Sequence, residues 1–199
     1  MWSSQVPDAE NGNVPALDAV FALLLSLDTI KPHPSLSKRL GALLKALQQP
    51  HSRRDREGLT ELIHALWISN ACPEARSRMA EAISAIDTQN PESAQVILNS
   101  LVALKPDWAE VYYKQAIVAM MTARPHDAIS HLGETLRLEP RHFAAISLFG
   151  QICLDLDRWH EARFAFQRAL HQNPHLKGLR EAISSISQRL DSRNKPLNA

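Results

Sequence analysis

Apolar residues recur at helical spacing in several short segments of the chain, and each segment is closed by proline or by a polar turn. A first helix is expected to start at Pro15, and the sequence 31–34, with its two prolines, should end it. Ser35 is a good N-cap for a second helix, and residues 55–69 predict a third. The region 15–72 should therefore hold three amphipathic helices, preceded by a polar, disordered tail at 1–14.

From residue 75 onward the pattern becomes periodic. Pro106, Pro140 and Pro174 follow one another at equal intervals along the chain. An alanine lies at one fixed distance before each of these prolines: Ala94, Ala128 and Ala162. A larger apolar residue lies between each alanine and its proline: Leu98, Leu132 and Phe166. A fixed period of this length predicts stacked copies of one small unit, none of which can bury its apolar face alone.

One copy shows what the unit should be. Residues 109–122 predict a helix, Arg124 and Pro125 a turn, and residues 127–138 a second helix. A small residue where the two helices cross lets their axes approach, and a larger apolar side chain fills the space beside it. The pattern is clearest in the last copy, where Gly150 stands at the expected crossing. The fold class is therefore all-α.

These residues resemble the tetratricopeptide repeat (TPR), a helix-turn-helix unit of about 34 residues. The copies lie at 75–108, 109–142 and 143–176, although Arg78 occupies a site where the family prefers an aromatic residue. The signature residues, expected to be structural, are Ala94, Pro106, Ala128, Pro140, Gly150, Ala162, Phe166 and Pro174. The resemblance implies a right-handed superhelical solenoid of the short, bacterial, three-repeat type. It also implies a capping helix at 177–190, followed by a tail at 191–199. The region 15–72 is out of register with the repeats, so it is either a degenerate repeat or an N-terminal helical cap, and the cap is favoured.

In this family the first helices of successive repeats line a concave groove that takes a peptide or an amphipathic helix. Carried onto this chain, the peptide-binding groove consists of Met79, Ile83, Tyr113, Lys114, Ile117, Met120, Met121, Leu148 and Gln151. Only Lys114 suits the clamp with which some members hold a carboxyl terminus, so recognition of chaperone tails is not expected. The implied function is a non-enzymatic adaptor or scaffold for a protein or peptide partner. Two alternatives stay open: a structural or oligomerisation module whose groove is filled by its own N-terminal helices, and a homodimer across the same strip.

Composition and motifs add little chemistry. A net charge of +1 gives no reason to expect nucleic acid, and the basic run at 53–56 is diluted by Asp55. Cys72 and Cys153 lie far apart, and Pro174 interrupts the pair His171 and His175, so no metal site is expected. Nucleophile motifs and phosphate-binding glycine loops are absent from the sequence, which predicts neither catalytic residues nor a cofactor.

The longest apolar run, residues 19–27, is too short to span a membrane, and no basic leader precedes it. The sequence therefore predicts a cytoplasmic protein without membrane insertion. A removed leader or a misassigned start would make it periplasmic instead.

Overall fold

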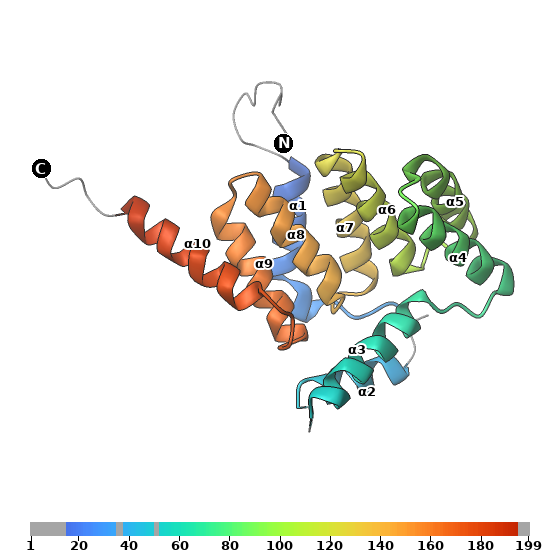
Figure 1. Ribbon diagram of the computed structural model, residues 1–199, viewed down its shortest axis with the longest axis horizontal. Helices are drawn as coiled ribbons and strands as arrows, with labels where there is room; N and C mark the ends of the chain where they lie inside the picture. Colours follow the sequence, from blue (N-terminus) through green and yellow to red (C-terminus); the bar gives the residue numbers. More distant parts are fainter. Residues whose placement is uncertain (1–14, 35–37, 50–51, 195–199) are drawn as a thin grey trace, which may run out of the picture.

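The computed structural model describes residues 15–34, 38–49 and 52–194 (Figure 1). Every regular element in these ranges is helical, which confirms the predicted all-α class. The predicted tail at 1–14, the N-cap at Ser35 and the last five residues lie outside the described ranges. The helices are α1 (Pro15–Leu25), the short 3-10 turn η1 (Leu27–Thr29), α2 (Lys38–Leu47), α3 (Arg53–Ile68), α4 (Pro73–Asp87), α5 (Pro91–Leu104), α6 (Ala109–Met121), α7 (Pro125–Leu138), α8 (Phe143–Asp155), α9 (Trp159–Gln172) and α10 (Leu179–Asn194).

The pairs α4–α5, α6–α7 and α8–α9 form three consecutive helical hairpins, and each packs on the next through α5 against α6 and α7 against α8. This is the solenoid predicted from the evenly spaced prolines. The hairpins begin at Pro73, Ala109 and Phe143, at or close to the first residues of the predicted copies. At the far end α10 packs on α9 and runs to Asn194, so the segment 191–194, predicted as tail, continues the last helix.

The turns inside the three hairpins have the same backbone conformation. Gln89, Ala123 and Asp157 occupy equivalent positions in the three turns, and all three have positive φ, at 57°, 54° and 58°. In each copy the next amide donates to the carbonyl five residues before it at 2.8 Å, as from Arg124 to Ala119. A left-handed residue of this kind closes a helix and saturates its last carbonyls. The sequence predicted a turn at Arg124 and Pro125 but not the positive φ, because glycine occupies none of the three positions.

Packing inside the hairpins explains the signature residues, most sharply in the third. A Cβ atom placed on Gly150 would come within 2.7 Å of the Phe166 ring and 3.2 Å of the Ala165 Cβ. Glycine therefore lets α8 and α9 approach with a phenylalanine between them. In the first two copies the corresponding pair is an alanine with a leucine, which fills comparable space: Ala82 with Leu98, and Ala116 with Leu132.

The array begins with a polar face. One side of α6 packs against α5 of the preceding repeat. The equivalent side of α4, which has no preceding repeat, carries small or charged residues, most of them exposed: Glu74, Ser77, Arg78, Glu81 and Ser84. A salt bridge of 2.7 Å joins Arg78 to Glu74 across one helical turn. A solvated first face needs no helix to cover it.

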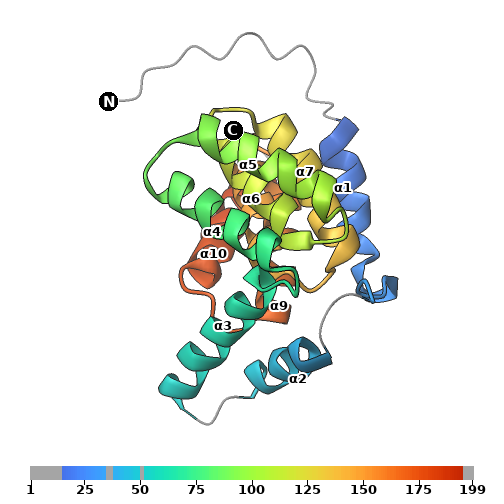
Figure 2. The same ribbon diagram turned by 90° about the vertical axis from the view of Figure 1, so that its right-hand side faces the viewer.

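Helix α1 packs on the second helices of the array, mainly α7 and to a smaller extent α9, and Figure 2 shows it beside α7. Leu17 and Leu24 are fully buried there. Gly133 on α7 allows the close approach, because a Cβ at that position would lie 3.0 Å from the Val20 side chain. Ion pairs across the contact join Arg158 to Asp18 and Arg168 to Asp28, at 2.8 and 2.7 Å.

The hairpin α2–α3 lies along the edge of the array where one repeat is joined to the next (Figures 1 and 2). Its leucines form a small core with Trp67 and with Phe143 at the start of α8. The Gln48 amide donates to the carbonyls of His171 and Gln172, at 3.0 and 2.7 Å. The N-terminal helices are thus not stacked on the first repeat as a terminal cap would be. Helix α1 and the α2–α3 hairpin contact mainly the second and third repeats, and only the end of α3 reaches the cluster of the first repeat.

Candidate peptide-binding face

The surface formed by the first helices of the hairpins, α4, α6 and α8, is called here the first-helix face. It corresponds to the groove that the sequence resemblance predicts. Ile117 and Met121 lie on α6 and are half-buried, yet neither belongs to the apolar clusters that make up the core. These two side chains therefore keep apolar surface that none of the described residues covers within these clusters.

The other predicted groove residues are bound more closely to the core. Tyr113, Met120 and Leu148 are partly buried against the main cluster, and Ile83 packs against the cluster of the first repeat. Gln151 is exposed, and its amide donates to Asp155 at 2.9 Å. The first-helix face thus offers a mixed surface, with an apolar centre on α6 and a polar border on α8.

The structure does not place Met79 on this face. The side chain is fully buried in the cluster of the first repeat together with Trp108. Ile68, the last residue of α3, and Cys72, in the connection to α4, pack against the same cluster. The connection thus helps to enclose a position that would be open in a regular array, which the repeat pattern could not indicate.

A buried polar cluster lies where the face meets the hairpin α2–α3. His142 is fully buried and caps α8, since its Nδ1 accepts from the Ala145 amide at 3.2 Å. The proton of the ring must then sit on Nε2, which donates to Glu110 Oε2 at 3.0 Å. Burial alone would raise the pKa of Glu110, but the His142 hydrogen bond and the Lys114 charge outweigh it, so the pKa lies below its ordinary value.

Lys114 is engaged inside the molecule rather than offered to a ligand. Its Nζ lies 3.2 Å from Glu110 Oε1, and its side chain is only 16% exposed. The one groove residue that suited a carboxylate clamp thus neutralises a buried acid. Neighbouring Tyr113 contacts the His142 ring, and burial raises the pKa of its phenol to about 12. Both residues therefore strengthen the junction more than they enlarge a binding surface.

Two tryptophans join the hairpin to the array at the same junction. The indole of Trp67 stacks on His142 at a centroid distance of 4.0 Å, and the Trp108 indole N–H donates to the Trp67 carbonyl at 2.7 Å. Sequence reasoning missed Trp67, Trp108, His142 and Glu110 as a group. The only signal in the sequence was Trp67, an aromatic residue on the apolar face of α3. The four residues are brought together by tertiary packing alone.

The arrangement bears on the alternative in which the N-terminal helices fill the groove. Helix α1 contacts the second helices, on the other side of the hairpins, and the α2–α3 hairpin covers the turns and the first residues of α6 and α8. Neither lies against Ile117 or Met121 in the apolar clusters. Among the described residues, Ile117 and Met121 thus stay outside the apolar clusters of the N-terminal helices, although α3 reaches the first residues of α6 and α8.

Across the ranges 15–34, 38–49 and 52–194, the helices are too short or too polar to cross a lipid bilayer. In the same ranges, no group of three or more histidine, cysteine or carboxylate side chains is arranged so that it could bind a metal ion. Cys72 and Cys153 are free thiols.

Similarity to known proteins agrees with this geometry. The family model for subunit 3 of the anaphase-promoting complex, or cyclosome, matches residues 77–169. A TPR repeat-containing protein of Rhizobium etli is 24% identical over 156 residues, which cover 78% of this chain and 76% of that protein. The three hairpins are similar to tetratricopeptide repeats. The matched range of the family model covers nearly all of the three hairpins, so the repeats account for the first-helix face.

A third similarity covers less than half of the chain. The protein O-mannosyl-transferase Tmtc3 of Drosophila melanogaster is 30% identical over 95 residues, 46% of this chain. The aligned part is 10% of that protein, so the chain spans a small fraction of it. What the TPR family suggests is a role in protein–protein interaction.

Proposed function

We propose that this protein is a non-enzymatic adaptor that binds an amphipathic helix or an extended apolar peptide of a partner on its first-helix face. The observation that carries the proposal is the uncovered apolar surface of Ile117 and Met121, in a chain whose other helices pack elsewhere. Methionine adapts its shape to a partner, and a helix can present residues at matching spacing. The nearby polar border on α8 supplies hydrogen-bonding groups at the rim.

The test compares two aspartate variants with a matched control. Ile117→Asp and Met121→Asp place a charge in the apolar centre, whereas Val96→Asp makes the same kind of change on α5, where the side chain is 71% exposed. Partners crosslinked in the native host and identified by mass spectrometry should be lost with the first two variants and retained with the third. Circular dichroism establishes that all three variants are folded.

The result that would overturn the proposal is equally direct. If Ile117→Asp and Met121→Asp capture the same partners at the same yield as the wild type, the first-helix face does not bind them. A homodimer across this face would show instead as a mass of two chains in sedimentation, abolished by the same two variants.

A further inference from the structure

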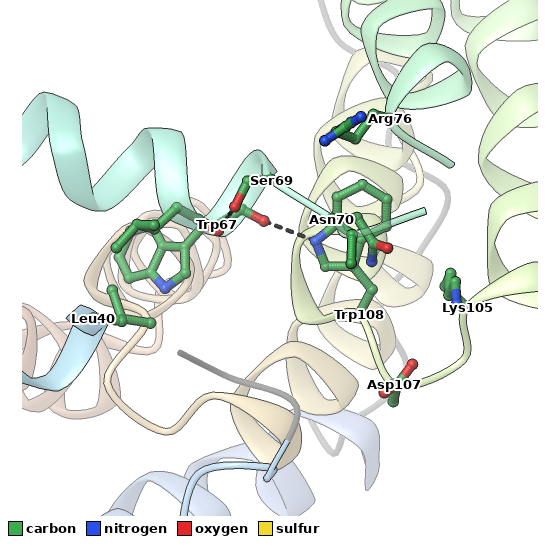
Figure 3. A pocket seen from close by; sticks show the side chains of 10 residues that line it. Leu40, Trp67, Ser69, Asn70, Arg76, Lys105, Asp107 and Trp108 are labelled. Atoms are coloured by element: carbon green, nitrogen blue, oxygen red, sulfur yellow. Dashed lines mark hydrogen bonds between the residues drawn. The ribbon is translucent and has the colours of Figure 1, made fainter. Parts of the chain in front are cut away.

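A second candidate site is the cavity between the α2–α3 hairpin and the start of the repeat array (Figure 3). Its volume is about 520 Å³, within the range of small-ligand sites. It is walled by α2, by the end of α3, by the connection to α4 and by the turn before α6. It borders the first-helix face only at Arg76, so the two sites can be tested separately.

The apolar part of this cavity is rigid. Leu40, Leu66 and the two indoles of Trp67 and Trp108 line it. The Trp67 ring is held by its stacking on His142, and the Trp108 ring by its hydrogen bond to the Trp67 carbonyl. Aromatic walls that are already fixed lose little freedom when a ligand binds.

The polar part of the cavity is unsatisfied. Arg76 and Lys105 line the same cavity, and Figure 3 shows both on the Trp108 side of it. Neither cation has an ion pair or a side-chain hydrogen bond in the described chain, unlike most arginines of the array. Among the described residues that line the cavity, the carboxylate belongs to Asp107, whose Oδ2 lies 3.9 Å from His33 Nδ1.

We infer that this cavity binds a short peptide segment that carries a carboxylate beside an apolar side chain. The carboxylate pairs with Arg76 and Lys105, and the apolar group rests on the indoles and leucines. The site is distinct from the first-helix face and needs no partner there. It would give the adaptor a second point of attachment, selective for acidic segments.

Three small probes test this on the full chain. Acetyl-leucyl-phenylalanine carries a terminal carboxylate, its amide carries none, and acetyl-aspartyl-phenylalanine amide carries the carboxylate on a side chain. The four indole N–H signals in a nitrogen–proton NMR spectrum report on binding, and that of Trp159, on the far side of the array, is the internal control. We expect the free acid to bind with a Kd on the order of 1 mM and to shift the Trp67 signal saturably.

Matched variants localise the effect. Arg76→Gln and Lys105→Gln should each weaken binding of the acid by about tenfold, whereas Lys177→Gln, an exposed cation elsewhere, should leave it unchanged. Trp67→Phe keeps an aromatic side chain at this wall, so the fold and most of the affinity should survive. The phenylalanine variant also assigns the Trp67 signal by its disappearance.

The outcomes separate cleanly. Binding of the aspartyl amide as tightly as the acid identifies the ligand as an acidic segment within a chain, and binding of the acid alone identifies a chain terminus; both support the inference. Equal binding of the uncharged amide, the absence of a saturable Trp67 shift, or unchanged affinity in Arg76→Gln and Lys105→Gln would each overturn it. Because Ile117 and Met121 take no part, this result does not depend on the proposal for the first-helix face.

Discussion

The repeat array and the N-terminal segment are both helical, but they are held together in different ways. In the array, the same pairing of a small with a large buried residue recurs in every hairpin, from Ala82 with Leu98 to Gly150 with Phe166. In the N-terminal segment, α1 lies on the second helices and the α2–α3 hairpin on the turns between repeats. Their contacts include ion pairs, carbonyl hydrogen bonds and a histidine stacked on a tryptophan.

This difference teaches what repetition does for a fold. A repeat needs only its neighbour, so its contacts follow from spacing along the chain. The N-terminal helices must match surfaces far away in the sequence, as Gln48 does at His171 and Gln172. Their position therefore depends on particular side chains at the turns, and three measurements can test the contrast.

The largest effect is expected inside the array, for Gly150→Ala. The added Cβ would meet the Phe166 ring at 2.7 Å, so α8 and α9 must separate or the ring must turn. We expect the free energy of unfolding to fall by about 1–3 kcal/mol, measured by urea denaturation.

The double variant Gly150→Ala with Phe166→Leu supplies the control, because it recreates the alanine–leucine pair of the first two copies. Its loss should be smaller than the sum of the two single losses by about 1 kcal/mol. If the two losses of unfolding free energy simply add, the small and large residues of the three copies do not pack in the same way.

The next effect concerns the junction with the N-terminal segment, and it depends on pH. Glu110→Gln keeps an acceptor for His142 but removes the charge that faces Lys114, so stability at pH 7 should fall by about 1–2 kcal/mol. The pKa of Glu110 is lowered in the folded chain, so its contribution is present above the unfolded value of about 4.3 and is lost as pH falls through the folded value.

The difference in unfolding free energy between wild type and Glu110→Gln should therefore be constant near neutrality and shrink below about pH 4. Asp155→Asn, on the exposed pair with Gln151, is the matched control and should show a much smaller difference. A gap between wild type and Glu110→Gln that stays constant down to pH 3 would contradict the role of the buried carboxylate.

The smallest effect is expected at the turns within the hairpins. Ala123 has a φ of 54°, which glycine adopts without the steric cost that alanine bears. Ala123→Gly should raise the free energy of unfolding by about 0.5–1 kcal/mol. The same change at Ala80, exposed in the middle of α4, should lower it by a similar amount. Destabilisation at both positions would show that the positive φ at Ala123 carries no strain.

The sequence by itself determined the repeat array. The spacing of Pro106, Pro140 and Pro174, with the small and large residues before them, predicted three helical hairpins and their order, because each hairpin leaves an apolar face that only the next can cover. It also indicated the region of the first-helix face, although burial removed Met79 and an ion pair engaged Lys114.

Only the tertiary structure decided where the N-terminal helices lie and which side chains meet there. Periodicity indicates that α1, α2 and α3 have apolar faces, but it does not say what those faces cover. Glu110, His142 and Trp67 come together through packing between distant segments, and the cavity beside Arg76 exists because of it. Local spacing carries no record of such contacts, since they depend on complementary shape and charge across the folded chain.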